Sequence, residues 1–170
     1  MIAYSPDQWT DFAVAQVGAS AALLGLVFVG ISINLKEIVG TSALVNRALE
    51  AIVLLGSVLL TATAVLIPGQ AREAVGVELV VVGALTALAL LRLQAGAAQD
   101  VVANGNRGPT RASIASRRVV DLGSAVLVVV AGILLLAEAG GGLYWWPAAI
   151  AAAYLGALGN AWVLLVEILR

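Results

Sequence analysis

Long apolar stretches alternate with short polar breaks along the whole chain. Five stretches are apolar over nearly their full length, and they cover residues 12–35, 51–67, 74–91, 119–137 and 143–166. An α-helix needs roughly 20 apolar residues, at about 1.5 Å each, to cross the hydrocarbon core of a bilayer. The pattern therefore predicts an all-α fold, a polytopic transmembrane bundle of five helices in one domain over residues 1–170.

The breaks between the stretches carry residues that end helices. Gly40, the pair Pro68 and Gly69, and a run of three glycines from Gly140 all lie between predicted spans. The longest break, over residues 95–116, is predicted to be a cytoplasmic loop whose flanks extend the two neighbouring helices. No separate soluble domain is expected.

The composition fits lipid as the main solvent and excludes several kinds of chemistry. Apolar residues make up 62% of the chain and charged residues only 11%, so a water-soluble globule would lack polar cover. The chain has no Cys and no His, which excludes thiolate and imidazole ligands and the catalytic dyads that need them. We therefore expect no enzymatic activity, no metal and no cofactor, and the net charge of −1 gives no reason to expect nucleic acid binding.

Basic residues predict the direction of the chain in the membrane. All but one of the nine Lys and Arg residues fall in alternate breaks, and the exception is Arg72. The residues on the basic side are Lys36, Arg47, Arg92, Arg107, Arg111, Arg117, Arg118 and Arg170. The positive-inside rule then places the N-terminus outside and the C-terminus inside. Four aromatic residues are predicted to settle at the outer interface, namely Trp9, Tyr144, Trp145 and Trp146.

The first apolar stretch has one face with polar ends. Gln16 and Asn34 are separated by about five helical turns and share this face, with Ser20 close to it. The aliphatic residues between them are Leu23, Val27 and Ile31. One interpretation is a narrow pore with polar mouths and an aliphatic constriction. The alternative is ordinary hydrogen bonding between packed helices.

Small residues form ridges on two of the stretches. Gly18, Ala22 and Gly25 lie opposite the polar-ended face of the first stretch, and Gly156 and Asn160 align on the last stretch. Ridges of this kind let helix backbones approach closely in lipid. These residues are predicted to mediate helix packing.

The second stretch carries a stripe of polar side chains. Ser57 and Thr61 fall within about 20° of Glu50 on a helical projection. The two hydroxyls are predicted to supply secondary polar contacts to the pore.

Three acidic residues are candidates for function because ionisable groups are costly inside a membrane. They are Glu50, Glu78 and Asp121. Glu50 and Asp121 share an inner layer with several arginines, so a structural belt of ion pairs is the alternative. Glu78 has only Arg72 or Arg92 as an expected partner.

Part of the chain resembles a family of small uncharacterised actinobacterial membrane proteins. The resemblance rests on residues 12–35 (FAVAQVGASAALLGLVFVGISINL), 47–50 (RALE) and 66–70 (LIPGQ). It implies a multi-pass protein of the bacterial cytoplasmic (inner) membrane. Some members are labelled modulators of the FtsH protease, which would imply regulation of a membrane-anchored quality-control protease. Modulators that resemble BAX-inhibitor proteins have seven spans and a pair of aspartates, whereas this chain has five predicted spans.

These patterns support two functional hypotheses from different classes. The leading one is a homo-oligomeric small pore or ion channel in the lipid bilayer. The alternative is a non-conducting interaction or regulatory protein that binds another membrane protein or lipid through its small-residue ridges. A substrate transporter ranks third, because the sequence shows neither an inverted repeat nor matching broken helices.

Overall fold

The computed structural model describes residues 2–103 and 111–166. Within these two ranges the chain forms helices and no strand. The long helices are α1 (Thr10–Ile33), α3 (Ser42–Val65), α4 (Arg72–Ala103), α5 (Arg111–Leu136) and α6 (Trp145–Val166), and the short ones are η1 (Ile2–Tyr4), η2 (Pro6–Trp9), α2 (Leu35–Val39) and η3 (Gly142–Tyr144). Five described helices are long and apolar enough to cross a membrane, which confirms the predicted all-α fold and helix number.

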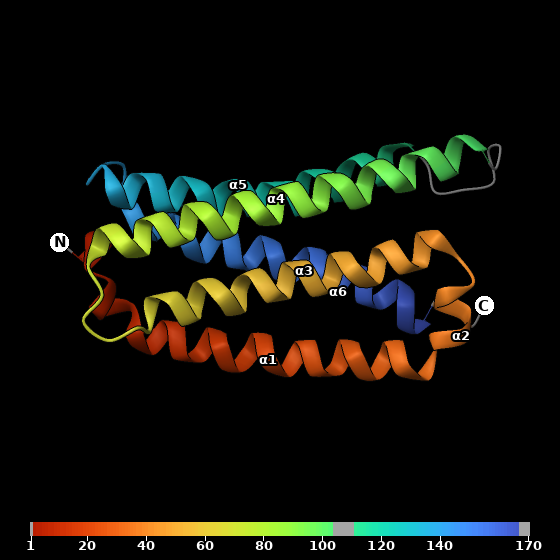
Figure 1. Cartoon of the computed structure of the whole chain (residues 1–170), viewed down its shortest axis with the longest axis horizontal. Coiled ribbons are helices and arrows are strands. Elements are labelled where there is room, and N and C mark those ends of the chain that lie inside the picture. Colours follow the sequence, from red (N-terminus) through yellow and green to blue (C-terminus); the bar gives the residue numbers. More distant parts are fainter. Residues whose placement is uncertain (1, 104–110, 167–170) are drawn as a thin grey trace.

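The five long helices lie side by side in one bundle (Figure 1). Helix α1 lies at one edge, α4 and α5 pack together at the other, and α3 and α6 lie between them. Helix α3 contacts α1, α4 and α6. Of the residues in an 18-residue apolar segment of each span, 61% are buried for α3, compared with 17% for the span that contains α1. The core of the bundle therefore lies around α3, and α1 is its least covered helix.

Three helices extend well beyond the predicted apolar stretches, because polar residues next to these stretches are also helical. Helix α3 begins at Ser42, well before the stretch over residues 51–67, because hydropathy marks only the apolar part of a helix. Helix α4 ends at Ala103 and helix α5 begins at Arg111, so the predicted loop over residues 95–116 is largely helical. Residues 104–110, with Arg107, and the C-terminal Arg170 lie outside the described residues.

The N-terminal segment packs on the turn that precedes α6. The backbone N–H of Gly141 donates a hydrogen bond to the Tyr4 hydroxyl at 3.2 Å. Gly142 has a φ of 46°, and a Cβ at this position would lie 2.5 Å from the carbonyl oxygen of Ala3. Both the backbone conformation and the close contact therefore require glycine at position 142.

Helices α4 and α5 touch each other through their backbones at three glycines. A Cβ on Gly132 of α5 would lie 2.7 Å from the Gly76 carbonyl oxygen and 2.9 Å from the Val80 nitrogen of α4. A Cβ on Gly83 of α4 would lie 3.0 Å from the Val129 nitrogen of α5. Small residues at such crossings allow close packing in lipid. These glycines were not among the predicted packing residues, although Gly76 and Gly83 share one face of α4.

Candidate functional site

The polar-ended face of α1 is turned into the bundle. Ser20 is fully buried, and Val27 is only 7% exposed. The Gln16 Oε1 accepts a hydrogen bond of 2.9 Å from the Tyr154 hydroxyl on α6. The Asn34 Nδ2 donates to the Leu164 carbonyl of α6 at 3.2 Å. The two residues predicted at the mouths of a pore thus form hydrogen bonds to another helix of the same chain. Internal partners of this kind stabilise polar groups in lipid.

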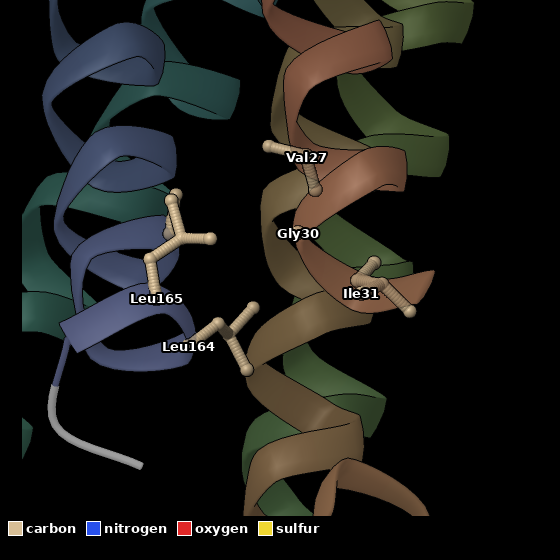
Figure 2. Close-up of a pocket in the computed structure, with 6 residues that line it drawn as sticks. Val27, Gly30, Ile31, Leu164 and Leu165 are labelled. Carbon is tan, nitrogen blue, oxygen red and sulfur yellow. The ribbon is translucent and has the colours of Figure 1, made fainter. Parts of the chain in front are cut away.

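The aliphatic middle of this face packs in the same way. Leu23 and Ile31 are half-buried and contact the hydrophobic core. A small cavity of about 10 Å³ lies between α1 and α6 (Figure 2). Its lining residues are Val27, Gly30, Ile31, Ala161, Leu164 and Leu165. A cavity of this size has room for about one water molecule at most.

The hydroxyls of α3 are also used inside the protein. Ser57 is 6% exposed and Thr61 is 1% exposed. The Ser57 Oγ donates to the Leu54 carbonyl at 2.7 Å, and the Thr61 Oγ1 donates to the Ser57 carbonyl at 2.9 Å. Thr61 also accepts a hydrogen bond of 3.2 Å from the indole Nε1 of Trp146 on α6. The stripe predicted from Glu50, Ser57 and Thr61 therefore faces the core.

Four aromatic rings close the end of the bundle where α1 begins. The ring of Trp9 lies 5.8 Å from Phe12, 5.5 Å from Tyr144 and 6.4 Å from Trp146, and Phe12 and Trp146 are 5.4 Å apart. Trp146 is fully buried and Trp9 is 9% exposed, whereas Tyr144 and Trp145 are exposed. The rings of Trp9 and Trp146 therefore pack inside this end of the bundle, whereas Tyr144 and Trp145 lie on its outside.

A buried polar cluster lies toward the other end, where α3, α5 and α6 meet. We define the polar cluster as Glu50 of α3, Arg117 and Asp121 of α5, and Asn160 of α6; all of these except Arg117 are fully buried. The Arg117 Nη2 lies 3.4 Å from the Glu50 Oε2, and its Nη1 donates to the Asn160 Oδ1 at 3.3 Å. One arginine thus links two neighbouring helices to α5. The charges of Glu50 and Arg117 are tolerated inside the bundle because they are paired with each other.

Gly156 provides the space for this cluster. A Cβ on Gly156 would overlap the Asp121 Oδ1 and would lie 3.0 Å from the Leu54 Cδ1. The small residue on α6 therefore permits α3, α5 and α6 to converge at one point. Gly156 and Asn160 both lie inside the bundle, on the face of α6 that packs on its own chain.

A second arginine joins α5 to α4 next to the polar cluster. The Arg118 Nη2 donates to the Gln94 carbonyl oxygen at 2.7 Å. Gln94 is 2% exposed, and neither polar atom of its side chain has a hydrogen-bond partner among the described groups. Gln94 was not among the predicted site residues, although an amide near the end of an apolar span is a usable signal.

Glu78 has a partner, Gln70, that was not predicted from the sequence. The Gln70 Nε2 donates a hydrogen bond of 2.7 Å to the Glu78 Oε1. Arg72, one of its two expected partners, instead forms salt bridges with Glu73 at 2.6 Å and Glu138 at 2.7 Å. Glu78 therefore belongs to a polar group at the end of the bundle opposite the polar cluster.

The small-residue ridge of α1 points away from the bundle. Gly18, Ala22 and Gly25 are exposed, and a Cβ on either glycine would meet no atom within 4 Å. This ridge therefore packs on no helix of the described chain. In this respect it differs from Gly156, whose neighbours are in the same chain.

The outward surfaces of the spans are apolar across their middle. Exposed residues of α4, α5 and α6 there are mostly large aliphatics, such as Leu85, Val126 and Leu155. The exposed polar side chains of the described spans lie near the ends of the apolar segments, as Asp11, Ser32 and Arg92 do. No polar stripe runs along the described outer surface.

This arrangement defines a class, an all-helical bundle whose five long apolar helices are compatible with an integral membrane protein. Comparisons with protein-family models, curated proteins and solved structures found no match.

Proposed function

We propose that this protein is a non-conducting membrane protein that acts by associating with other membrane helices, first of all with a second copy of itself. The contrast between its interior and its exterior carries the proposal. Polar side chains within the spans, such as Gln16 and Thr61, bind partners in the same chain. The part of the outer surface that the structure describes offers no polar lining for a pore between copies, and hydrated conduction needs such a lining or a wide opening.

The ridge of Gly18, Ala22 and Gly25 on α1 fits a second copy. On the other helices the exposed surface carries large aliphatic side chains such as Leu85 and Leu155, which suit contact with lipid. The ridge carries only small residues, and a Cβ on either of its glycines would meet no atom of the same chain within 4 Å. Two copies inserted in the same direction are related by a two-fold axis along the bilayer normal. This axis brings the ridge of one copy against the ridge of the other, with the two α1 helices parallel. Small residues on both helices then allow close backbone contact.

The charge distribution supports an orientation for this assembly. Lys36, Arg47 and Arg92 lie toward the end of the bundle that holds the polar cluster, and Arg72 lies toward the other end. The positive-inside rule favours a cytoplasmic position for the first end and an external N-terminus. A bacterial cytoplasmic membrane as the location is part of this proposal.

We expect Gly25→Leu to reduce self-association in liposomes by about tenfold or more, because a leucine would separate the two ridges. The measurement is energy transfer between labelled copies as the protein-to-lipid ratio is varied. Gly159→Leu on α6 is the matched control, since Gly159 is also exposed and its Cβ would meet nothing. Equal behaviour of the two variants, or a wild-type protein that stays monomeric at every density, would contradict the proposed contact.

We also expect no ion flux through liposomes that contain the purified protein. Val27→Ser is expected to leave flux at the level of protein-free vesicles, because Val27 lies in the apolar contact between α1 and α6 of one chain. The measurement is dye-reported flux of several cations and anions. Flux above the vesicle background in the wild-type protein would favour the pore instead.

A further inference from the structure

The Asp121 carboxyl lies where three helices meet, away from water. It is fully buried, and neither of its oxygens has a hydrogen-bond partner among the described protein groups. A Cβ built on Gly156 of α6 would overlap the Asp121 Oδ1 and lie 3.0 Å from a methyl carbon of Leu54 on α3, so these two helices come close to the carboxyl here. An ionised carboxylate in such surroundings is strongly disfavoured unless a cation or several donors compensate its charge.

The arginines that face Asp121 favour its charge, but neither donates a hydrogen bond to its oxygens, and burial and a neighbouring acid act against the charge. Arg47 and Glu50 act on it from α3, and Arg117 acts on it from α5. From α6 the described part contributes the neutral residues Gly156 and Asn160. Arg117 precedes Asp121 by one helical turn, but its guanidinium is directed to Glu50 and Asn160. No salt bridge joins Arg117 to Asp121 in the described part of the chain.

The two buried acids of the polar cluster therefore have unequal surroundings. Glu50 has a cation at 3.4 Å, whereas Asp121 has a second negative charge nearby and no donor of its own. When two neighbouring acids have too little positive charge around them to balance both, the arrangement is most stable if one of them carries a proton. The geometry makes Asp121 the acid that carries it.

We propose that Asp121 is a proton-binding site that controls the contact between α5 and α6. The carboxylic acid form fits the arrangement seen here, with Arg117 bound to Glu50 and Asn160. When the proton leaves to water, the new carboxylate attracts Arg117, which is one turn away on the same helix. Arg117 then turns from Asn160, and α6 loses a bond to α5. The ligand of this site is the proton itself.

Infrared spectroscopy of the protein in lipid tests this site directly, because a protonated carboxylic acid has a carbonyl band that a carboxylate lacks. During a titration from acid to neutral pH, we expect a buried-acid band in the wild-type protein that persists after exposed acids have ionised. The band should be absent in Asp121→Asn. It should remain in Asp11→Asn, the same substitution at an exposed acid near the start of α1.

Glu50→Gln keeps the test decisive if Asp121→Asn does not fold. Removing the neighbouring negative charge should leave the Asp121 band in place but make it disappear at a lower pH than in the wild-type protein. A purely structural role for Asp121 would produce no such displacement. The inference is overturned if the wild-type protein shows no buried-acid band, if Asp121→Asn retains it, or if Glu50→Gln removes it or leaves its titration unchanged. None of these outcomes bears on self-association through α1.

Discussion

Gly132→Ala is expected to lower the free energy of unfolding by about 2–3 kcal/mol, the upper part of the range for overpacking a filled interior. The added methyl group would lie 2.7 Å from the Gly76 carbonyl oxygen and 2.9 Å from the Val80 nitrogen. Both atoms belong to the backbone of α4, so no side-chain rotation relieves the contact. The two helices must move apart and lose packing along their length. Equilibrium unfolding in mixed micelles measures the effect.

Gly123→Ala is the matched control for this prediction. Gly123 lies on the same helix α5, and its Cβ would meet no atom within 4 Å. Alanine is favoured over glycine in a helix by roughly 0.5–1 kcal/mol, so this variant should be neutral or more stable. Equal changes in the unfolding free energy of the two variants would show that α4 and α5 do not touch at Gly132.

Arg117→Ala is expected to lower the free energy of unfolding by about 3–5 kcal/mol, the usual effect of removing one partner from a buried ion pair. The substitution leaves Glu50, which is fully buried, without the guanidinium at 3.4 Å. It also removes the hydrogen bond that Asn160 accepts from α5. The effect should appear in the same unfolding measurement and should be accompanied by faster hydrogen exchange in α3 and α6.

Two further variants separate the ion pair from a general effect of losing an arginine. The double variant Glu50→Leu with Arg117→Met should recover most of the lost stability, because apolar residues of similar volume replace buried pairs at little cost. Arg72→Ala should leave the stability close to wild type, since the Glu73 and Glu138 side chains that Arg72 pairs with are 61% and 59% exposed. Failure of the double variant to recover stability would indicate that Arg117 acts mainly through Asn160 or Asp121.

Helical periodicity was a good guide to which residues share a face, and a poor guide to where that face points. Gln16, Ser20 and Asn34 do lie on one side of α1, but this side contacts α3 and α6. A pore axis and a neighbouring helix need the same residue types on the same face, so the pattern does not distinguish them. The ridge of Gly18, Ala22 and Gly25 was equally visible in the sequence, and its outward direction was not.

The number, order and approximate length of the five long apolar helices follow from the sequence alone. Apolar runs of about 20 residues have one stable form in lipid, because every backbone polar group must be satisfied within the segment. The hydrogen-bond and ion-pair partners of the polar side chains, in contrast, depend on how the helices pack. Tyr154 and Gln16 are 138 positions apart, and Arg117 reaches Glu50 across 67 positions. In a water-soluble bundle the apolar face of each helix would point inward. Lipid is as apolar as the core, so apolar residues do not mark the inner face of a membrane helix. The direction of each face therefore depends on packing and hydrogen bonds between distant segments.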